Sequence, residues 1–179
     1  MRIIQRLGVV AACLGGLTTS SVQAQWEPVE PPELEAPSEW AGLLALGPRD
    51  VWAAGSEDGP DGFSWSYEPG AKNAGRPVLQ RWDGTAWRRT ELPDWHGELH
   101  AVTALGKDDV WVAGVDAELQ PGRVMMLHYD GRSWTREFLR SAGTVHKLNL
   151  ARVPGTSQLW LTNSRGPGYS DKPVVFRRR

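Results

Sequence analysis

The chain has 179 residues, and 20 Lys and Arg against 21 Asp and Glu give it a formal net charge of −1. This near balance argues against a broad basic surface for nucleic-acid phosphates, and the single cysteine excludes an internal disulfide. Ten tryptophans, 20 glycines and 13 prolines favour strands and turns over helices. The composition therefore predicts an all-β protein.

Residues 1–24 have the organisation of a secretory signal peptide. Arg2 and Arg6 precede an apolar run over residues 7–17, and small residues lie before a cleavage point after Ala24. The run is shorter than the about 20 apolar residues that span a bilayer. We therefore expect no membrane span and an exported protein, periplasmic, cell-surface or extracellular. Lipid anchoring at Cys13, which ends a lipobox-like Val-Ala-Ala-Cys string, is the less favoured alternative.

Residues 25–39 form a Pro/Glu-rich segment. Its four prolines favour an extended backbone. One interpretation is a solvated linker. The other is an outer strand at residues 26–30, beginning at Trp26, that pairs near residues 174–178 and so protects a sheet edge.

From residue 40 to residue 179 the sequence repeats itself. DVWAAG at residues 50–55 and RWDGTAW at residues 81–87 recur as DVWVAG at 109–114 and HYDGRSW at 128–134. The first motif is echoed once more as QLWLTN at residues 158–163. A spacing of about 50 to 60 residues is typical of propeller blades. We therefore expect one repeat domain over residues 40–179.

The first two repeats each contain four short segments that are rich in β-branched and aromatic residues, as strands are, and the third is a degraded copy with three: residues 148–153, 158–163 and 174–179. Asp-Gly pairs lie between the third and fourth segments, where glycine readily supplies the positive φ of a tight hairpin. Asp50 and Asp109 recur in the same way and are assigned to turn hydrogen bonding. The residues expected to form the structural core and turns of the repeats are Trp52, Trp111, Trp160, Trp87, Trp134, Asp83, Gly84, Asp130 and Gly131.

The DVWxAG and WDGxxW pair resembles the propeller-type repeats of bacterial secreted proteins and is loosely kelch-like. The resemblance covers about residues 40–179 and implies a propeller-like array of about three four-stranded antiparallel blades. Kelch repeats usually carry a Gly-Gly pair where this chain has only Gly55 and Gly114. The resemblance implies no catalytic residue. Three blades are fewer than the four to eight of closed propellers, so the array is expected to be incomplete or to be completed by a second copy in a homodimer.

The longest loops follow the DVWxAG segments and their third-repeat counterpart, and such loops are where binding residues are usually mounted. Aromatic side chains beside charged ones could stack on a ligand and hydrogen-bond to it. The candidate ligand-binding residues are Asp58, Asp61, Trp65, Tyr67, Arg165, Tyr169 and Asp171.

The acidic residues near position 58 lack the spacing of a calcium loop, and the four histidines lack zinc-ligand spacing, so neither a metal nor a cofactor is expected. No catalytic motif is evident, which leaves enzymatic activity uncertain and less favoured. The sequence predicts an exported, non-enzymatic binding or protein-interaction module. The alternatives are a carbohydrate-binding propeller lectin and a fragment of a propeller hydrolase or lyase.

Overall fold

The computed structural model describes residues 29, 33–35, 38–57, 75–116, 123–139, 145, 147–164 and 174–178. In this part of the chain the structure contains eleven strands and no helix, and therefore no helix long and apolar enough to cross a membrane. The predicted signal peptide, with Cys13, lies outside the described residues.

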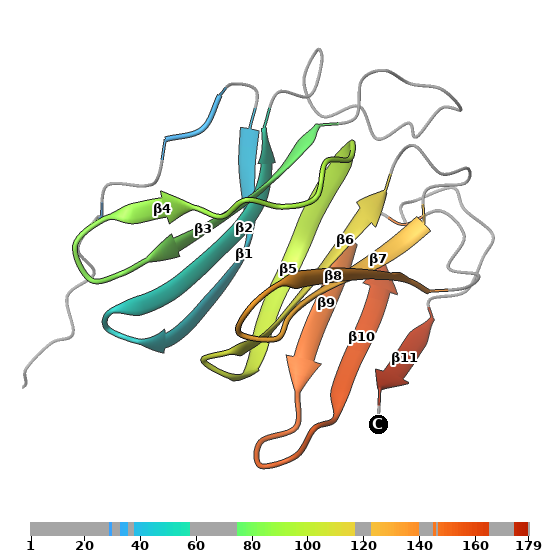
Figure 1. Ribbon diagram of the computed structural model, residues 1–179. Helices are drawn as coiled ribbons and strands as arrows, with labels where there is room; N and C mark the ends of the chain where they lie inside the picture. Colours follow the sequence, from blue (N-terminus) through green and yellow to red (C-terminus); the bar gives the residue numbers. More distant parts are fainter. Residues whose placement is uncertain are drawn as a thin grey trace, which may run out of the picture. The chain divides into compact units, whose positions relative to one another are not determined.

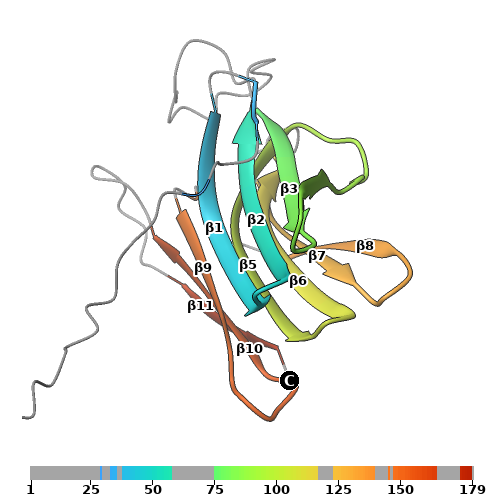
Figure 2. The same ribbon diagram turned by 90° about the vertical axis from the view of Figure 1, so that its left-hand side faces the viewer.

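The strands form three antiparallel sheets, which lie next to one another in chain order (Figures 1 and 2). The first sheet has the order β1 (Ser38–Gly47), β2 (Asp50–Glu57), β3 (Arg76–Trp82) and β4 (Trp87–Arg89). The second has the order β5 (Gly97–Gly106), β6 (Asp109–Asp116), β7 (Arg123–Tyr129) and β8 (Trp134–Phe138). The third has the order β11 (Val175–Arg178), β10 (Leu159–Ser164) and β9 (Lys147–Arg152). The all-β expectation is confirmed at this level.

The first two sheets have the same internal pairing. Trp52 of β2 lies opposite Arg81 of β3, and Trp111 of β6 lies opposite His128 of β7. The first strand of each sheet shifts register at two corresponding points. These lie between Trp40 and Gly42 and between Ala45 and Gly47 in β1, and between Leu99 and Ala101 and between Ala104 and Gly106 in β5.

Asp-Gly turns join the third and fourth strands of both sheets, as predicted. Gly84 and Gly131 have φ values of 96° and 90°, a region that favours glycine. The Asp83 carboxylate accepts the Ala86 N–H at 2.9 Å, and Asp130 accepts backbone N–H groups in the same way. The hydroxyl of Thr85, the neighbouring N–H groups and Arg88 hold the pKa of Asp83 far below its usual range.

The second sheet is packed on both faces because its strands alternate between two cores. Val110 and Val112 of β6 lie in a core shared with the first sheet. Trp111, Ala113 and Val115, the alternate residues of the same strand, lie in a second core shared with the third sheet. This alternation explains why the DVW segments are apolar at nearly every position.

The repeated tryptophans do not all have the same environment. Trp52 and Trp111 are 3% and 2% exposed and belong to the two cores. Trp134 packs edge-on against Trp52 with ring centroids 6.1 Å apart, and Trp87 is half-buried beside Trp82. Trp160 is 39% exposed, so its assignment to the core is wrong. It lies on the outer face of the third sheet, which no other sheet covers among the described residues.

The Pro/Glu-rich segment is described at only a few positions before β1. Val29 is exposed and belongs to no strand, and the other residues of the outer strand that the sequence allowed, 26–28 and 30, lie outside the described residues. Residues 33–35 are not simply solvated, because the carbonyl oxygen of Glu33 accepts a hydrogen bond from Gln80 at 3.4 Å. Residues 33–35 therefore pack on the outer face of the first sheet.

Candidate functional site

The sheets have two distinct ends. The loop end is the end at which β2, β6 and β10 finish and β3, β7 and β11 begin. The hairpin end is the opposite one, where short turns join β1 to β2, β5 to β6 and β9 to β10, at the bottom of Figure 1. The candidate functional site lies at the loop end.

The predicted ligand-binding residues belong to segments that leave this end. The first group follows β2 and the second follows β10 in the sequence. All of them, Asp58, Asp61, Trp65, Tyr67, Arg165, Tyr169 and Asp171, lie outside the described residues. The ends of the strands next to these segments are described, and they show which residues surround the points where the segments begin.

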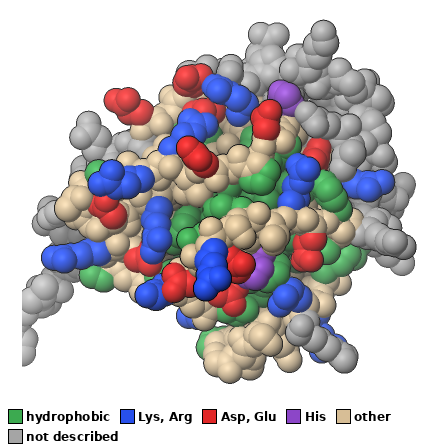
Figure 3. Space-filling view, viewed as in Figure 1, with side chains coloured by type: hydrophobic (Ala, Val, Ile, Leu, Met, Phe, Trp, Pro, Cys, Tyr) green, Lys and Arg blue, Asp and Glu red, His purple; other side chains and the backbone are tan. Residues whose placement is uncertain are grey.

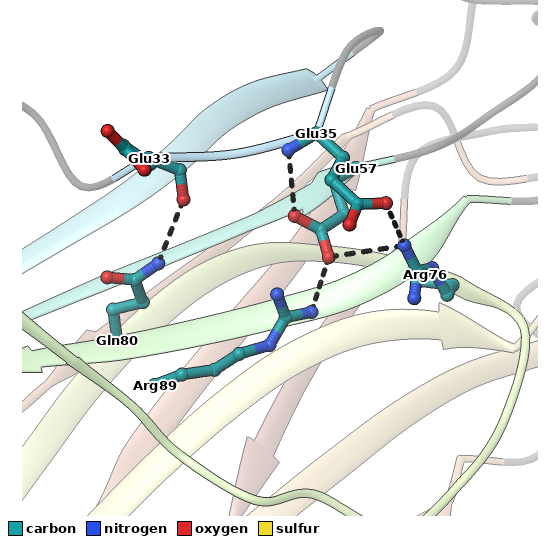
Figure 4. A network of polar contacts seen from close by, with 6 residues as sticks. All are labelled: Glu33, Glu35, Glu57, Arg76, Gln80 and Arg89. Atoms are coloured by element: carbon teal, nitrogen blue, oxygen red, sulfur yellow. Dashed lines mark hydrogen bonds and ion pairs between the residues drawn. The ribbon is translucent and has the colours of Figure 1, made fainter.

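Glu57, the last residue of β2, is the centre of a polar network (Figure 4). Its side chain is 1% exposed. One carboxylate oxygen accepts a hydrogen bond from Arg89 Nη2 at 2.5 Å, and the other accepts the backbone N–H of Glu35 at 3.1 Å. Arg76 lies 3.6 Å from Glu57 and also pairs with the Glu35 carboxylate at 2.5 Å. Two arginines are thus fixed beside Glu57, the last described residue before the long loop.

The network determines the charge of Glu57. Burial alone would raise its pKa, but the Arg89 hydrogen bond, the Glu35 N–H and the charges of Arg89 and Arg76 outweigh that effect. The pKa of Glu57 is therefore held below its usual range. The group stays ionised and keeps both arginines in place.

Replacing Glu57 by glutamine is expected to lower the free energy of unfolding at pH 7 by about 1.5–3 kcal/mol, the usual worth of hydrogen bonds to a charged group. Because the folded-state pKa is lowered, the carboxylate stabilises the fold above its unfolded pKa of about 4.3. That contribution is lost as the pH falls through the folded-state pKa. Urea unfolding over a pH series measures this, and the two proteins should converge in acid.

Glu39→Gln is the matched control for this experiment. Burial and the charge of Glu98 raise the pKa of Glu39, while His100 and Lys147 act in the opposite direction. A neutral side chain is therefore tolerated there, and the substitution should not lower stability at pH 7. An equal loss at both positions would contradict the assignment of Glu57 as the network's centre.

The second sheet carries an acid–arginine pair at the same positions. Asp116, the last residue of β6, is buried and lies 3.8 Å from Arg136. Arg89 and Arg136 are both the third residue of their strand, counted from Trp87 and Trp134. Aligning the two repeats could have revealed this pair, because each arginine follows the WDGxxW-type motif by two residues.

Charged residues also lie near the beginning of β1, β5 and β9, the first strand of each sheet, at the loop end. Glu39 of β1, Glu98 of β5 and Lys147 of β9 lie opposite Ser56, Val115 and Ser164, which are matching positions in the three sheets. Buried His100 links two of these sheets, because its Nδ1 accepts the Leu148 N–H at 3.2 Å and its Nε2 lies 3.0 Å from Glu98. In the described residues no group of three or more His, Cys, Asp or Glu side chains could hold a metal ion.

A pocket of about 530 Å³ opens beside the Glu57 network. Arg76, Pro77 and Arg89 line one side, and residues 90–95, which lead into the second sheet, line the other. The side chains of Arg76 and Arg89 are about half exposed. Glu91 and Asp94 add acidic groups to the wall, so the pocket offers both donors and acceptors.

The hairpin end of the first sheet is occupied by an internal ion pair. Arg81 binds Asp50 through two hydrogen bonds, of 2.8 and 2.9 Å, and its guanidinium lies 4.8 Å from the centre of the Trp52 ring. Asp50 was expected to bond within the turn, but it bonds across to β3 instead. Trp52 lies on the same face two residues after Asp50, and the Arg81 guanidinium that Asp50 fixes in place holds the Trp52 ring against the core.

The second sheet repeats this arrangement with a histidine. His128 stacks on Trp111 with ring centroids 3.9 Å apart, and its Nε2 lies 2.9 Å from Asp109. Asp109 also accepts the Trp111 Nε1–H at 2.7 Å. The turn assignment is therefore corrected for Asp109 as well as for Asp50. These groups satisfy one another, which makes the loop end the better candidate for a site.

On the face shown in Figure 3, acidic and basic side chains are interspersed with hydrophobic ones. No protein-family model, curated protein or solved structure matches the chain. The interpretation of the site therefore rests on its geometry.

Proposed function

We propose that the protein is an exported, non-enzymatic binding module with a propeller-like architecture, and that it holds a segment of another protein at the loop end. The observation that carries this proposal is the pocket beside Arg76 and Arg89. It adjoins the point where the loop with Asp58, Asp61, Trp65 and Tyr67 leaves β2 and returns to β3. A rigid scaffold with long loops at one end is a common way to mount a binding site.

The charges of the pocket favour a peptide segment that carries both signs. Arg76 and Arg89 suit a carboxylate, and Glu91 and Asp94 suit a basic side chain. Trp95 also lines the pocket but is buried, so it supports the fold more than it offers a face on which a sugar could stack. A protein ligand is therefore preferred to a carbohydrate.

Peptide and glycan arrays probed with the purified chain test this proposal. We expect peptide ligands, and we expect the double variant Glu91→Lys, Asp94→Lys to bind them at least tenfold more weakly. Both residues are exposed and stand outside the Glu57 network, so the fold should persist. Arg132→Glu, in the exposed turn between β7 and β8, is the control and should bind normally.

Three outcomes would overturn the proposal. Binding to glycans alone would favour the lectin. Turnover on a panel of hydrolase and lyase substrates would favour the enzyme. Equal loss of binding in the Arg132 control would show that the ligand does not bind at the loop end.

A further inference from the structure

The two contacts between sheets are built in the same way. We call the Trp face the side of a sheet that carries the tryptophan of its second strand, and the aliphatic face the opposite side. The Trp face of the first sheet, with Trp52, packs against the aliphatic face of the second, with Val110 and Val112. The Trp face of the second, with Trp111, packs against the aliphatic face of the third, with Leu161. Each contact joins unlike faces.

Two faces carry no further sheet in the described part of the chain. On the Trp face of the third sheet, Trp160 is 39% and Val175 is 59% exposed. On the aliphatic face of the first sheet, Leu43 is 70% exposed. The position that corresponds to Leu43 in the second sheet is Val102, which lies opposite Val112 and is buried at 7%. Trp160 and Leu43 are therefore exposed at positions whose counterparts are buried in the contact that the protein already makes twice, while Ala53 and Val78, on the same face as Leu43, are already buried in the single chain.

Residues 33–35 limit how much of the first sheet is available. They pack over Glu57, at the loop end, and over Gln80, which lies opposite Ala53 on the same face. Ala53 also pairs with Leu43, so the covered part of the face reaches the level of Leu43, and the part that stays exposed is on β1, at Leu43 and Ala45. Trp160 lies toward the hairpin end of the third sheet, as the second residue of β10. Measured along the strands from the hairpin end, the exposed parts of the two faces thus lie at corresponding positions.

We propose that the Trp face of the third sheet in one copy packs on the aliphatic face of the first sheet in a second copy. Two copies arranged head to tail form this contact twice, and both exposed faces of each copy are then covered. Burial of Trp160, Val175 and Leu43 supplies the driving force, as it does for their counterparts inside the chain. The partner is thus a second copy of this protein, and the contact continues the existing order of sheets.

Sedimentation equilibrium of the full chain at micromolar concentration tests the pairing. The wild type should have the mass of two chains, and Trp160→Glu and Leu43→Glu should each have the mass of one. Both residues are exposed in the single chain, so the variants should keep the wild-type circular dichroism spectrum. Arg132→Glu, outside both faces, is the control and should remain a dimer.

Mixing the two variants distinguishes unlike from like faces. One copy then has an intact Trp face and the other has an intact aliphatic face, so an equimolar mixture should regain a species with one of each chain. Native mass spectrometry identifies it by mass. A monomeric wild type, variants that still pair, a mixture that stays monomeric, or assemblies larger than two copies would each overturn the proposal.

Discussion

Replacing Trp111 by alanine is expected to lower the free energy of unfolding by about 3–5 kcal/mol, the range found for buried aromatic residues. The ring is almost fully buried and stacks on His128, and the Arg178 guanidinium lies 4.3 Å from its centre. The substitution also removes the hydrogen bond to Asp109. For a domain of this size the melting temperature should fall by roughly 10 °C. Thermal and urea unfolding measure both quantities.

Trp160→Ala is the matched control, because Trp160 occupies the corresponding position in the third sheet. Its ring is partly exposed, with Arg177 5.6 Å from its centre, and the expected loss is about 1 kcal/mol or less. The comparison must be made at a concentration where the chain is a monomer. Equal losses at the two positions would mean that Trp160 is buried in the single chain, contrary to the structure.

Replacing Gly114 by alanine is expected to destabilise the protein by about 3 kcal/mol, at the upper end of the usual range for overpacking. A Cβ at this position would overlap the carbonyl oxygen of Glu98 in the neighbouring strand β5. The same close approach occurs between Gly55 and Glu39 in the first sheet. The Glu98 carbonyl belongs to the backbone of β5, which cannot move away from the added methyl group as the end of a flexible side chain could. Urea unfolding at pH 7 gives the loss.

Gly106→Ala shows whether the effect comes from this contact or from the loss of a glycine. Gly106 ends β5, and a Cβ there would meet nothing within 4 Å. Its replacement should change stability by no more than about 0.5 kcal/mol. If Gly114→Ala proved as mild as Gly106→Ala, the register shift in β5 would have to relax more easily than its packing indicates.

Local rules were sufficient to predict the strands and the turns between them. The Asp-Gly pairs at Asp83 and Asp130 require only a glycine at positive φ and a carboxylate that caps the turn, and both are visible in a few consecutive letters. The apolar DVW segments are typical of strands packed on both faces. In β6, Trp111 belongs to one core and its neighbours in sequence, Val110 and Val112, belong to the other.

The pairs across strands could not be predicted in the same way, because they depend on register over loops of different length. Arg81 and His128 begin the two aligned motifs, but they have unlike side chains and stand at unequal distances in the sequence from Trp52 and Trp111, so the contacts that they share with these tryptophans and with Asp50 and Asp109 were hidden. The exposure of Trp160 was missed for another reason. Its sequence context resembles that of Trp111, and only the absence of a fourth described sheet distinguishes the two.

The enclosure of the second sheet has a consequence for how the native state opens. Its strand β6 is hydrogen-bonded along both edges and covered on both faces. Each outer sheet can separate from the middle one and still leave β6 covered on one side. Amide groups of β6 therefore exchange with solvent only after such a separation or in the unfolded chain, whereas those of β4 and β11, at sheet edges, exchange through much smaller fluctuations.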